Sequence, residues 1–417
     1  MNGEPETTDH GAFRPDLVRG MTERRMSRRQ LLRGGAAVGG AAAITALLSA
    51  CSIQGSVASQ AEDPVDWTAY WRDAKKTETL NFANWPLYID SSHGKSESIA
   101  LFEQATGIRV DYQPVIQDNA NFYATVSPIL RAHGATGYDI VVMTNGWELT
   151  EMIKNGFVAE LDHSRLPNFA ANASDAVKSP NYDPGNKHSL VWQTGFTGIA
   201  YNPKYIDREI TSWEDLRDPA FKGRVGMYSD NTEIGAAALL AIGIDPGSST
   251  PKDWRKAQAW LQKQRPLVAG YYDQSYINRL ENGDTWITQA WSGDVFQAQQ
   301  SGFPHLEFIT PKEGQMTWHD NMMIPRQAEN PMAALSWMDF YYTPKIAGIV
   351  EDYVNYVCPV PGAQDYVRNE LDDAAVADSP LVFPSAEVLS NSHEFPVFRN
   401  YDEYAEWNSL FNAVIQS

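Results

Sequence analysis

Strand-like apolar runs alternate with helical patterns early in the chain, and this alternation constrains the fold more than any other feature of the sequence. The strand-like runs are Leu80–Ala83, Ile108–Tyr112 and Tyr138–Met143. The helical stretches that follow them are Ser96–Ala105, Asn119–Ala132 and Glu148–Lys154. A continuous apolar run such as Ile140–Val142 is typical of a strand that is covered on both faces. The pattern predicts a largely parallel sheet with helices on its faces.

A second set of strands and helices begins near residue 198. Further strands are expected at Gly198–Asn202, Thr285–Ala290 and Asn321–Pro325. Helices are expected at Ser212–Leu216, Glu233–Ile242, Lys252–Gln264, Pro331–Tyr342 and Pro344–Tyr353. The 417 residues exceed one ordinary domain of about 100–200 residues. We therefore expect two α/β lobes with a ligand site in the crevice between them.

The first fifty residues have the pattern of an export signal. A basic segment, Ser27–Arg33, precedes a weakly apolar run rich in Ala and Gly that is too short for a membrane-spanning helix. The pair Arg28-Arg29 resembles a twin-arginine signal, and Leu48-Ser49-Ala50-Cys51 resembles the bacterial lipobox. The prediction is cleavage after residue 50 and lipid attachment at Cys51, which would anchor the chain outside the cytoplasmic membrane. The alternative is a chance Leu-x-Ala-Cys beside an ordinary signal.

Composition narrows the class of partner. The chain has 52 Asp+Glu against 33 Lys+Arg, a net charge of −19, and this excess of acid argues against nucleic acid or an anionic membrane surface as the main partner. Two cysteines cannot form a disulfide framework. With Cys51 assigned to lipid, Cys358 is expected to be a buried small apolar residue. Residues 52–78 are expected to be a tether with one short helix around Trp67–Lys75.

The sequence lacks the common catalytic and metal-binding motifs. It has no G-x-S-x-G, no G-x-x-x-x-G-K-[ST] and no H-E-x-x-H, and its eight histidines are scattered. We therefore expect a protein that is not an enzyme and needs no cofactor or metal. Two tyrosine pairs are candidate iron ligands. Packing is the better explanation for Tyr341-Tyr342, whereas metal binding stays open for Tyr271-Tyr272.

Four segments place tryptophans or acids in turn-like positions. They are Asn84–Tyr88, Asp230–Glu233, Ala290–Asp294 and Trp318–Asn321. In this order and spacing they resemble the polyamine (spermidine/putrescine) binding proteins of bacterial ABC importers, and the similarity runs from about Thr79 to the C-terminal region. The best-matching stretches are Thr106–Val110, Tyr138–Val142 and Pro311–Gly314.

The resemblance implies the type II fold of periplasmic binding proteins, in which two lobes joined by crossing hinge strands close on the ligand. It implies lobe 1 segments at residues 79–196 and 319–364, and lobe 2 segments at 197–318 and 365–417. The implied function is capture of a putrescine- or spermidine-like cation outside the membrane by a monomer, and delivery to an ABC permease.

The resemblance also assigns roles to single residues. Aromatic walls of the site would come from Trp85, Tyr88 and Tyr356, with the hydroxyl of Thr144 and the ring of Trp147 beside them. An acid pair, Asp230 and Glu233, would bind one terminal ammonium, and Asp320 would accept from an amine. The rings of Trp291 and Trp318 would enclose the methylene chain between them. Aromatic faces attract cations by about 0.5–2 kcal/mol and bury methylenes, so these residue types suit a polyamine. Leu87 departs from the family, which commonly has an acid there, and Gly146 is an apparent insertion.

Other interpretations stay open for these residues. Asp230 and Glu233 fit a helix capping box, and Trp291 and Trp318 fit a hydrophobic core. The same fold could bind iron, a sugar or another amine. A different class, an exported hydrolase, could use Asp230, Glu233 or Asp320 as paired carboxylates.

Overall fold

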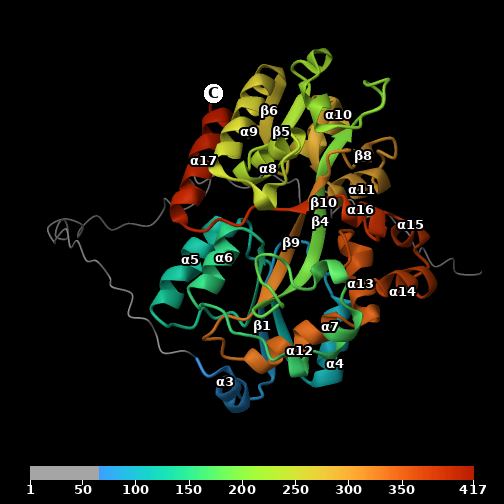
Figure 1. Cartoon of the computed structure of the whole chain (residues 1–417). Helices are drawn as coiled ribbons and strands as arrows, with labels where there is room; N and C mark the ends of the chain where they lie inside the picture. Colours follow the sequence, from blue (N-terminus) through green and yellow to red (C-terminus); the bar gives the residue numbers. More distant parts are fainter. Residues whose placement is uncertain (1–64) are drawn as a thin grey trace, which may run out of the picture.

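A computed structural model describes residues 65–417, which form a mixed α/β structure around one continuous sheet (Figure 1). The strand order is β2-β1-β3-β9-β4-β7-β5-β6, and β10 lies beside β9 and β8 beside β4. The signal, the lipidation site Cys51 and the first part of the tether lie outside the described residues. No helix within residues 65–417 is long and apolar enough to cross a membrane.

The first lobe is built on three parallel strands, β1 (Thr79–Ala83), β2 (Arg109–Gln113) and β3 (Ile140–Thr144). Its helices are α4 (Glu97–Thr106), α5 (Asn119–Arg131), α6 (Trp147–Lys154), α12 (Pro331–Tyr341) and α13 (Pro344–Val354). Each was predicted to within a few residues. Helix α4 shows why, since the Ser96 side chain caps its first turn and Gly107 ends it with a φ of 73°.

The second lobe has the parallel strands β5 (Val225–Tyr228), β6 (Val268–Tyr272) and β7 (Ile287–Trp291). Its helices are α8 (Asn231–Ala241), α9 (Pro251–Gln264), α10 (Tyr276–Asn282), α11 (Ser292–Gln300) and α17 (Tyr401–Ile415). In Figure 1 the C-terminal helix α17 lies against α9. The sequence patterns did not predict β5, β6, α10, α11 and α17.

Two long strands, β4 (Ser189–Tyr201) and β9 (Gln315–Met323), run through both lobes. They pair antiparallel with each other; β3 flanks one end of β9, and β7 flanks one end of β4. The strands predicted at 198–202 and 321–325 therefore begin too late, since β4 begins at residue 189 and β9 at residue 315. All nine residues of β9 are buried, so its sequence lacks the alternation that marks a half-exposed strand.

The remaining elements are short. They are α3 (Trp67–Asp73), α7 (Pro167–Asn172), β8 (Glu307–Ile309), α14 (Ala363–Asn369), α15 (Ala374–Ala377), α16 (Ala386–Ser390) and β10 (Ser392–Glu394). Single 3₁₀ turns also occur, and one of them stands where a helix was expected at 212–216. Helix α14 packs against α13, and β10 extends the sheet beside the start of β9. The lobe boundaries near residues 197, 319 and 365 stay predictions.

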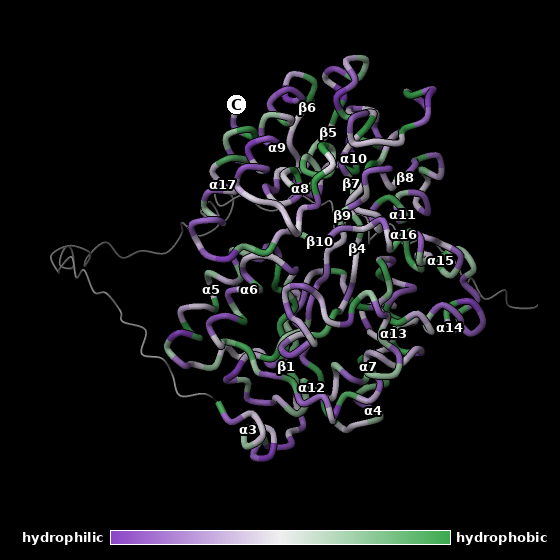
Figure 2. Tube along the Cα trace, viewed as in Figure 1, coloured by the Kyte–Doolittle hydropathy of each residue, from purple (hydrophilic) through white to green (hydrophobic). Residues whose placement is uncertain are grey.

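The core of residues 65–417 consists of one large apolar cluster and two smaller ones, and Figure 2 shows hydrophobic residues along interior segments such as β5 and hydrophilic ones along the outer α9. Tyr341 and Tyr342 are fully buried and donate hydrogen bonds to the carbonyls of Trp192 and Val191, which confirms packing. Cys358 is buried, as expected.

The other tyrosine pair, Tyr271-Tyr272, lies in strand β6, which the sequence patterns did not predict. The guanidinium of Arg265 lies 5.4 Å from the ring centre of Tyr271, and that of Arg279 lies 4.6 Å from the ring centre of Tyr272. A cationic neighbour on each ring disfavours a further metal cation at this pair.

Candidate functional site

Five aromatic rings form a chain that runs from the first lobe to the second. The ring of Tyr88 lies 6.1 Å from that of Tyr356, which lies 5.2 Å from Trp318. Trp318 in turn lies 6.5 Å from Trp291, and Trp291 stacks on Tyr228 at 4.6 Å. Three of the four segments that carry tryptophans or acids therefore meet at the crossing strands, and Glu233 brings the fourth there through its hydrogen bond with Trp291.

Trp318 and Asp320 lie within strand β9, which corrects the expectation that they stand in a turn. Alternation along the strand places these two side chains on the same face of the sheet. Trp318 pairs with Gly195 of β4, where an added Cβ would come within 2.1 Å of the indole ring. Gly293 makes room for Tyr356 in the same way, because a Cβ there would lie 2.6 Å from that ring. Glycine is required at both positions so that the rings can approach the backbone.

Asp320 is the most enclosed acid of the site on the side of the first lobe. Its Oδ2 accepts a hydrogen bond from the Tyr88 hydroxyl at 2.5 Å, and its Oδ1 accepts one from Thr144 at 2.6 Å. Only 5% of the residue is exposed, and this burial raises the pKa of Asp320 to about 6. Tyr88 and Thr144 thus orient the carboxylate as neutral donors.

Glu233 plays the matching part in the second lobe. Its Oε1 accepts hydrogen bonds from Thr197 at 3.0 Å and from the indole of Trp291 at 2.9 Å. The Oε2 atom is buried and has no hydrogen-bond partner within residues 65–417. Burial raises the pKa of Glu233 to about 8, with Asp230 adding repulsion.

Asp230 is the N-cap of α8, as the interpretation of this segment as a helix cap predicted. Its Oδ1 accepts from the backbone N–H groups of Thr232 at 2.7 Å and Glu233 at 3.0 Å. The reciprocal half of a capping box is not formed, since the Glu233 carboxylate turns to Trp291 instead. Asp230 is exposed to solvent, yet desolvation by the surrounding protein, together with the charge of Asp118, raises its pKa.

A carboxylate that the sequence analysis did not select completes the set. Asp294, in the first turn of α11, is 7% exposed and accepts hydrogen bonds from Tyr276 at 2.9 Å and Tyr356 at 2.8 Å. Burial raises its pKa to about 6. Its segment was singled out for Trp291, but nothing local distinguishes Asp294 from any acid in a first helical turn.

Trp85 and Trp147 are less closely joined to the ring chain. Trp85 is half-buried after β1, and within the described chain no other aromatic ring stacks on it. Trp147 stacks on Tyr404 of α17 with ring centres 4.8 Å apart and planes 7° apart. It therefore joins the first lobe to the C-terminal helix. The roles of all ten residues as ligand contacts stay predictions.

An acidic rim flanks Asp230. Glu148 of α6 accepts a hydrogen bond from Tyr404 at 3.2 Å, and its pKa is raised by burial and by the charges of Asp230 and Asp118. Asp118 caps α5 and also raises the pKa of Asp230. The field at this edge of the site therefore favours cations. No group of three or more His, Cys, Asp or Glu side chains in residues 65–417 is arranged to hold a metal ion.

Comparison with known proteins gives relatives of one kind. A "Spermidine/putrescine-binding periplasmic protein" of Escherichia coli (strain K12) is 30% identical over 319 residues, which are 76% of this chain and 86% of that one. A "Putrescine-binding periplasmic protein SpuD" of Pseudomonas aeruginosa is 30% identical over 366 residues, 84% of this chain and 92% of the relative.

Solved structures share the fold. The spermidine/putrescine ABC transporter substrate-binding protein of Streptococcus pneumoniae superposes with a TM-score of 0.71 at 23% identity, covering 82% of this chain and 99% of that one. A putative spermidine/putrescine ABC transporter from Listeria monocytogenes gives 0.67 at 26% identity, covering 81% and 99%. The family profile described as "Bacterial extracellular solute-binding protein" matches residues 137–391. With that match over more than half its length and relatives aligned over most of theirs, the chain belongs to the bacterial extracellular solute-binding proteins, and its fold is their two-lobed α/β fold.

Proposed function

We propose that this protein captures a polyamine, a putrescine- or spermidine-like cation, and delivers it to an ABC permease. One observation carries the proposal. Three buried carboxylates, Asp320, Asp294 and Glu233, are placed among the five rings, and within the described chain none of them pairs with a Lys, Arg or His side chain. A buried acid without a cationic partner is costly unless a ligand supplies the charge.

The physics of the site matches the alternation of charge and hydrocarbon in a polyamine. Each methylene buried against a ring contributes about 0.8 kcal/mol, and each ammonium near a ring face about 0.5–2 kcal/mol. The carboxylates hold their positions through tyrosine, threonine and indole donors, so they are oriented before the ligand arrives. An ammonium would then meet ready acceptors.

The positions of the acids favour a compact diamine within this class. Asp294 and Asp320 both connect to the ring pair Tyr356 and Tyr88, one carboxylate to each hydroxyl. Leu87, which stands where the family commonly has an acid, cannot bind a further ammonium beyond Tyr88. Two charges separated by a short methylene chain would use these two acceptors, and Glu233 beside Trp291 would add a further contact to one of them.

Several finer parts of the proposal rest on sequence and family likeness. The lobes, with boundaries near residues 197, 319 and 365, would close on the ligand about β4 and β9. Cleavage after a twin-arginine signal and acylation of Cys51 would hold the monomer at the outer face of the cytoplasmic membrane. The recognition residues would be Trp85, Tyr88, Thr144, Trp147, Asp230, Glu233, Trp291, Trp318, Asp320 and Tyr356, joined by Asp294.

Calorimetric titration of the full-length chain tests the proposal. Putrescine or spermidine is expected to bind with micromolar or tighter affinity, and Asp320→Asn is expected to weaken binding about a hundredfold because one charge-assisted contact of about 1.5–3 kcal/mol is lost. Asp111→Asn is the matched control, since Asp111 is exposed on the edge strand β2. Binding of a sugar or a ferric chelate with no response to any polyamine would overturn the assignment of ligand.

A further inference from the structure

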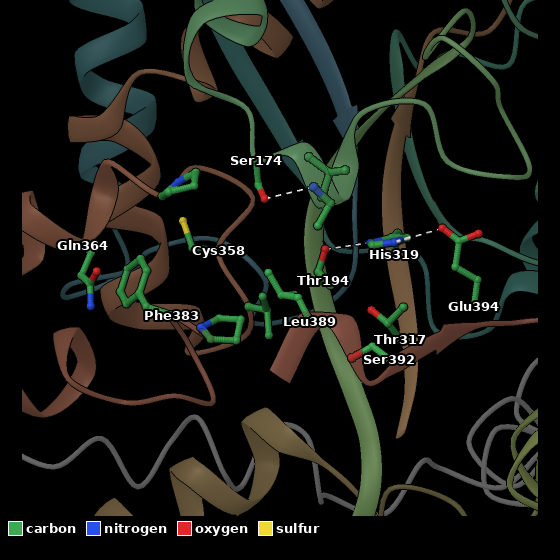
Figure 3. Close-up of a pocket in the computed structure, with 15 residues that line it drawn as sticks. Ser174, Thr194, Thr317, His319, Cys358, Gln364, Phe383, Leu389, Ser392 and Glu394 are labelled. Atoms are coloured by element: carbon green, nitrogen blue, oxygen red, sulfur yellow. Dashed lines mark hydrogen bonds and ion pairs between the residues drawn. The ribbon is translucent and has the colours of Figure 1, made fainter. Parts of the chain in front are cut away.

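A cavity lies against the crossing strands β4 and β9 (Figure 3). Side chains alternate along β9, so Thr317 and His319 face this cavity while Trp318 and Asp320 face the proposed polyamine site. The cavity has a volume of about 280 Å³, slightly below the usual 300–1,000 Å³ of ligand pockets. Its size suits a small molecule of few heavy atoms.

One polar atom in this cavity is buried and unsatisfied. His319 is 2% exposed, and its Nδ1 lies 2.8 Å from the Thr194 hydroxyl. Its Nε2 has no hydrogen-bond partner within the described chain, and the nearest charge, Oε1 of Glu394, lies 3.9 Å away. That separation is too long for a hydrogen bond. A polar atom placed between the two would satisfy both.

The charges that line the cavity favour a positively charged ligand atom at this position. Burial lowers the pKa of His319 to about 4, so the imidazole is neutral at pH 7. The residues that line the cavity include Glu394 and no Lys or Arg. Glu394 uses its Oε2 to accept a hydrogen bond from the Asn181 N–H at 3.3 Å, which leaves Oε1 turned to His319.

The rest of the lining is largely apolar. Val177, Val357, Phe383 and Leu389 supply hydrocarbon surface, and Figure 3 shows Phe383 and Leu389 on the side of the cavity away from Glu394. The cavity therefore combines one anionic end with an apolar body. This is a different pattern from the ring chain, where several acids are distributed along the site.

We propose that this cavity is a second binding site, which takes a small primary amine with one positive charge and a compact apolar body. The ammonium donates to Glu394 and to Nε2 of His319, with the Nδ1–H of the same ring donating to Thr194, while the hydrocarbon contacts Phe383 and Leu389. Because residues 318–320 are consecutive in β9, ligands at the two sites act on the same strand.

Titration with n-butylammonium chloride, followed by calorimetry on the full-length chain, tests this site. To disable the proposed polyamine site the titration is made in the Asp320→Asn background, where saturable binding of one butylammonium per chain is expected to persist. Glu394→Gln is expected to weaken it about ten- to hundredfold through loss of a charge-assisted hydrogen bond. Butan-1-ol, the neutral analogue, is expected to bind at least about tenfold more weakly.

Two further variants keep the result interpretable. Leu389→Trp fills the cavity from its apolar side and is expected to abolish binding. Because it leaves Glu394 unchanged, it tests the cavity independently of any effect of Glu394→Gln on the local fold. Glu387→Gln on α16, an acid outside the cavity lining, is the matched control and is expected to bind as the parent does. No saturable binding, equal binding of butan-1-ol, or unchanged binding by both Glu394→Gln and Leu389→Trp would each overturn the proposal.

Discussion

At the scale of single residues, the three buried acids beside the ring chain share one property, which is that burial favours their protonated forms. Burial raises the pKa of Asp294 and Asp320 to about 6 and that of Glu233 to about 8. An arriving ammonium favours the ionised forms, so ligand binding lowers these pKa values and expels protons. Between pH 6 and 8 we expect putrescine to bind more tightly as the pH rises.

Calorimetry in two buffers measures the expelled protons directly. Near pH 7 the observed heat of putrescine binding is expected to differ between phosphate and Tris, because the two buffers take up protons with different enthalpies. Glu233→Gln is expected to reduce the difference, whereas Glu370→Gln, which changes an exposed acid, is expected to leave it intact. Identical heats in both buffers would contradict the assignment of these acids as ligand contacts.

Glu351 gives a prediction about stability that is independent of the ligand. The residue is fully buried in α13, and burial raises its pKa well above the usual value, against smaller opposing effects of the Tyr356 N–H and of the Gln193 and Cys358 side chains. The folded state therefore binds a proton that the unfolded state releases above pH 4.5 or so. This contribution to stability is full at low pH and is lost as the pH rises, by up to about 1.4 kcal/mol per pH unit.

Glu351→Gln removes this titration. The variant is expected to lose less stability than the parent between pH 5 and pH 8, and to melt at a higher temperature at pH 8. Thermal unfolding followed by circular dichroism across that range is the measurement, with Glu370→Gln as control. If the stability of Glu351→Gln and that of Glu370→Gln depend on pH in the same way, Glu351 does not cause the loss of stability as the pH rises.

At the scale of elements, the crossing strands position the ring chain through their glycines. Gly195→Ala places a methyl group where the Trp318 ring now lies, and an aromatic ring held between strands cannot move without displacing its neighbours. We expect putrescine affinity to fall at least about tenfold and stability to fall by about 1–3 kcal/mol. Titration calorimetry and thermal unfolding give the two values.

Gly247→Ala is the matched control for that substitution. Its added methyl group would meet the Asp245 carboxylate at 3.7 Å, an ordinary contact, and the residue lies in a 3₁₀ turn away from the rings. Parental affinity and stability are expected. A Gly195→Ala chain that binds putrescine as the parent does would remove Trp318 from the site.

The helices and short parallel strands of the first lobe could be predicted because their signals are local. Ser96 and Gly107 mark the ends of α4, and Ile140–Val142 is long enough to identify β3. Strands β4 and β9 could not be bounded, because burial on both faces removes the period-two pattern. Helix α17 did carry a signal, since Trp407, Phe411 and Val414 recur at helical spacing and are its buried residues.

The site shows the same division between local and tertiary information. Family likeness placed Tyr88, Thr144 and Asp320 in one site, and the structure joins them by hydrogen bonds. Asp294 gave no local signal, because its role depends on the hydroxyls of Tyr276 and Tyr356, which are distant in sequence. Trp147 was itself predicted as a site residue, but its stack on Tyr404 of α17 could not be, because the two residues are 257 positions apart in the sequence.

At the scale of the whole molecule, the proposed ligand would touch both lobes. Tyr88 and Thr144 come from the first lobe and Glu233 and Trp291 from the second, while β4 and β9 continue through both. A ligand that contacts both lobes favours the arrangement in which they are closest, by as much as its affinity differs between the states. We therefore expect saturating putrescine to reduce the radius of gyration measured by small-angle X-ray scattering.

The contact between Trp147 and Tyr404 refines this prediction, because it joins the lobes without the ligand. Trp147→Ala removes the stacked pair, so the ligand-free chain is expected to expand and putrescine to compact it by a larger amount. Trp286→Ala is the matched control, since it removes a similar stack on Tyr205, 5.5 Å apart and inclined by 7°, within the second lobe alone. A radius of gyration that putrescine leaves unchanged in all three chains would contradict lobe closure, because no state of the molecule would then be favoured by the ligand.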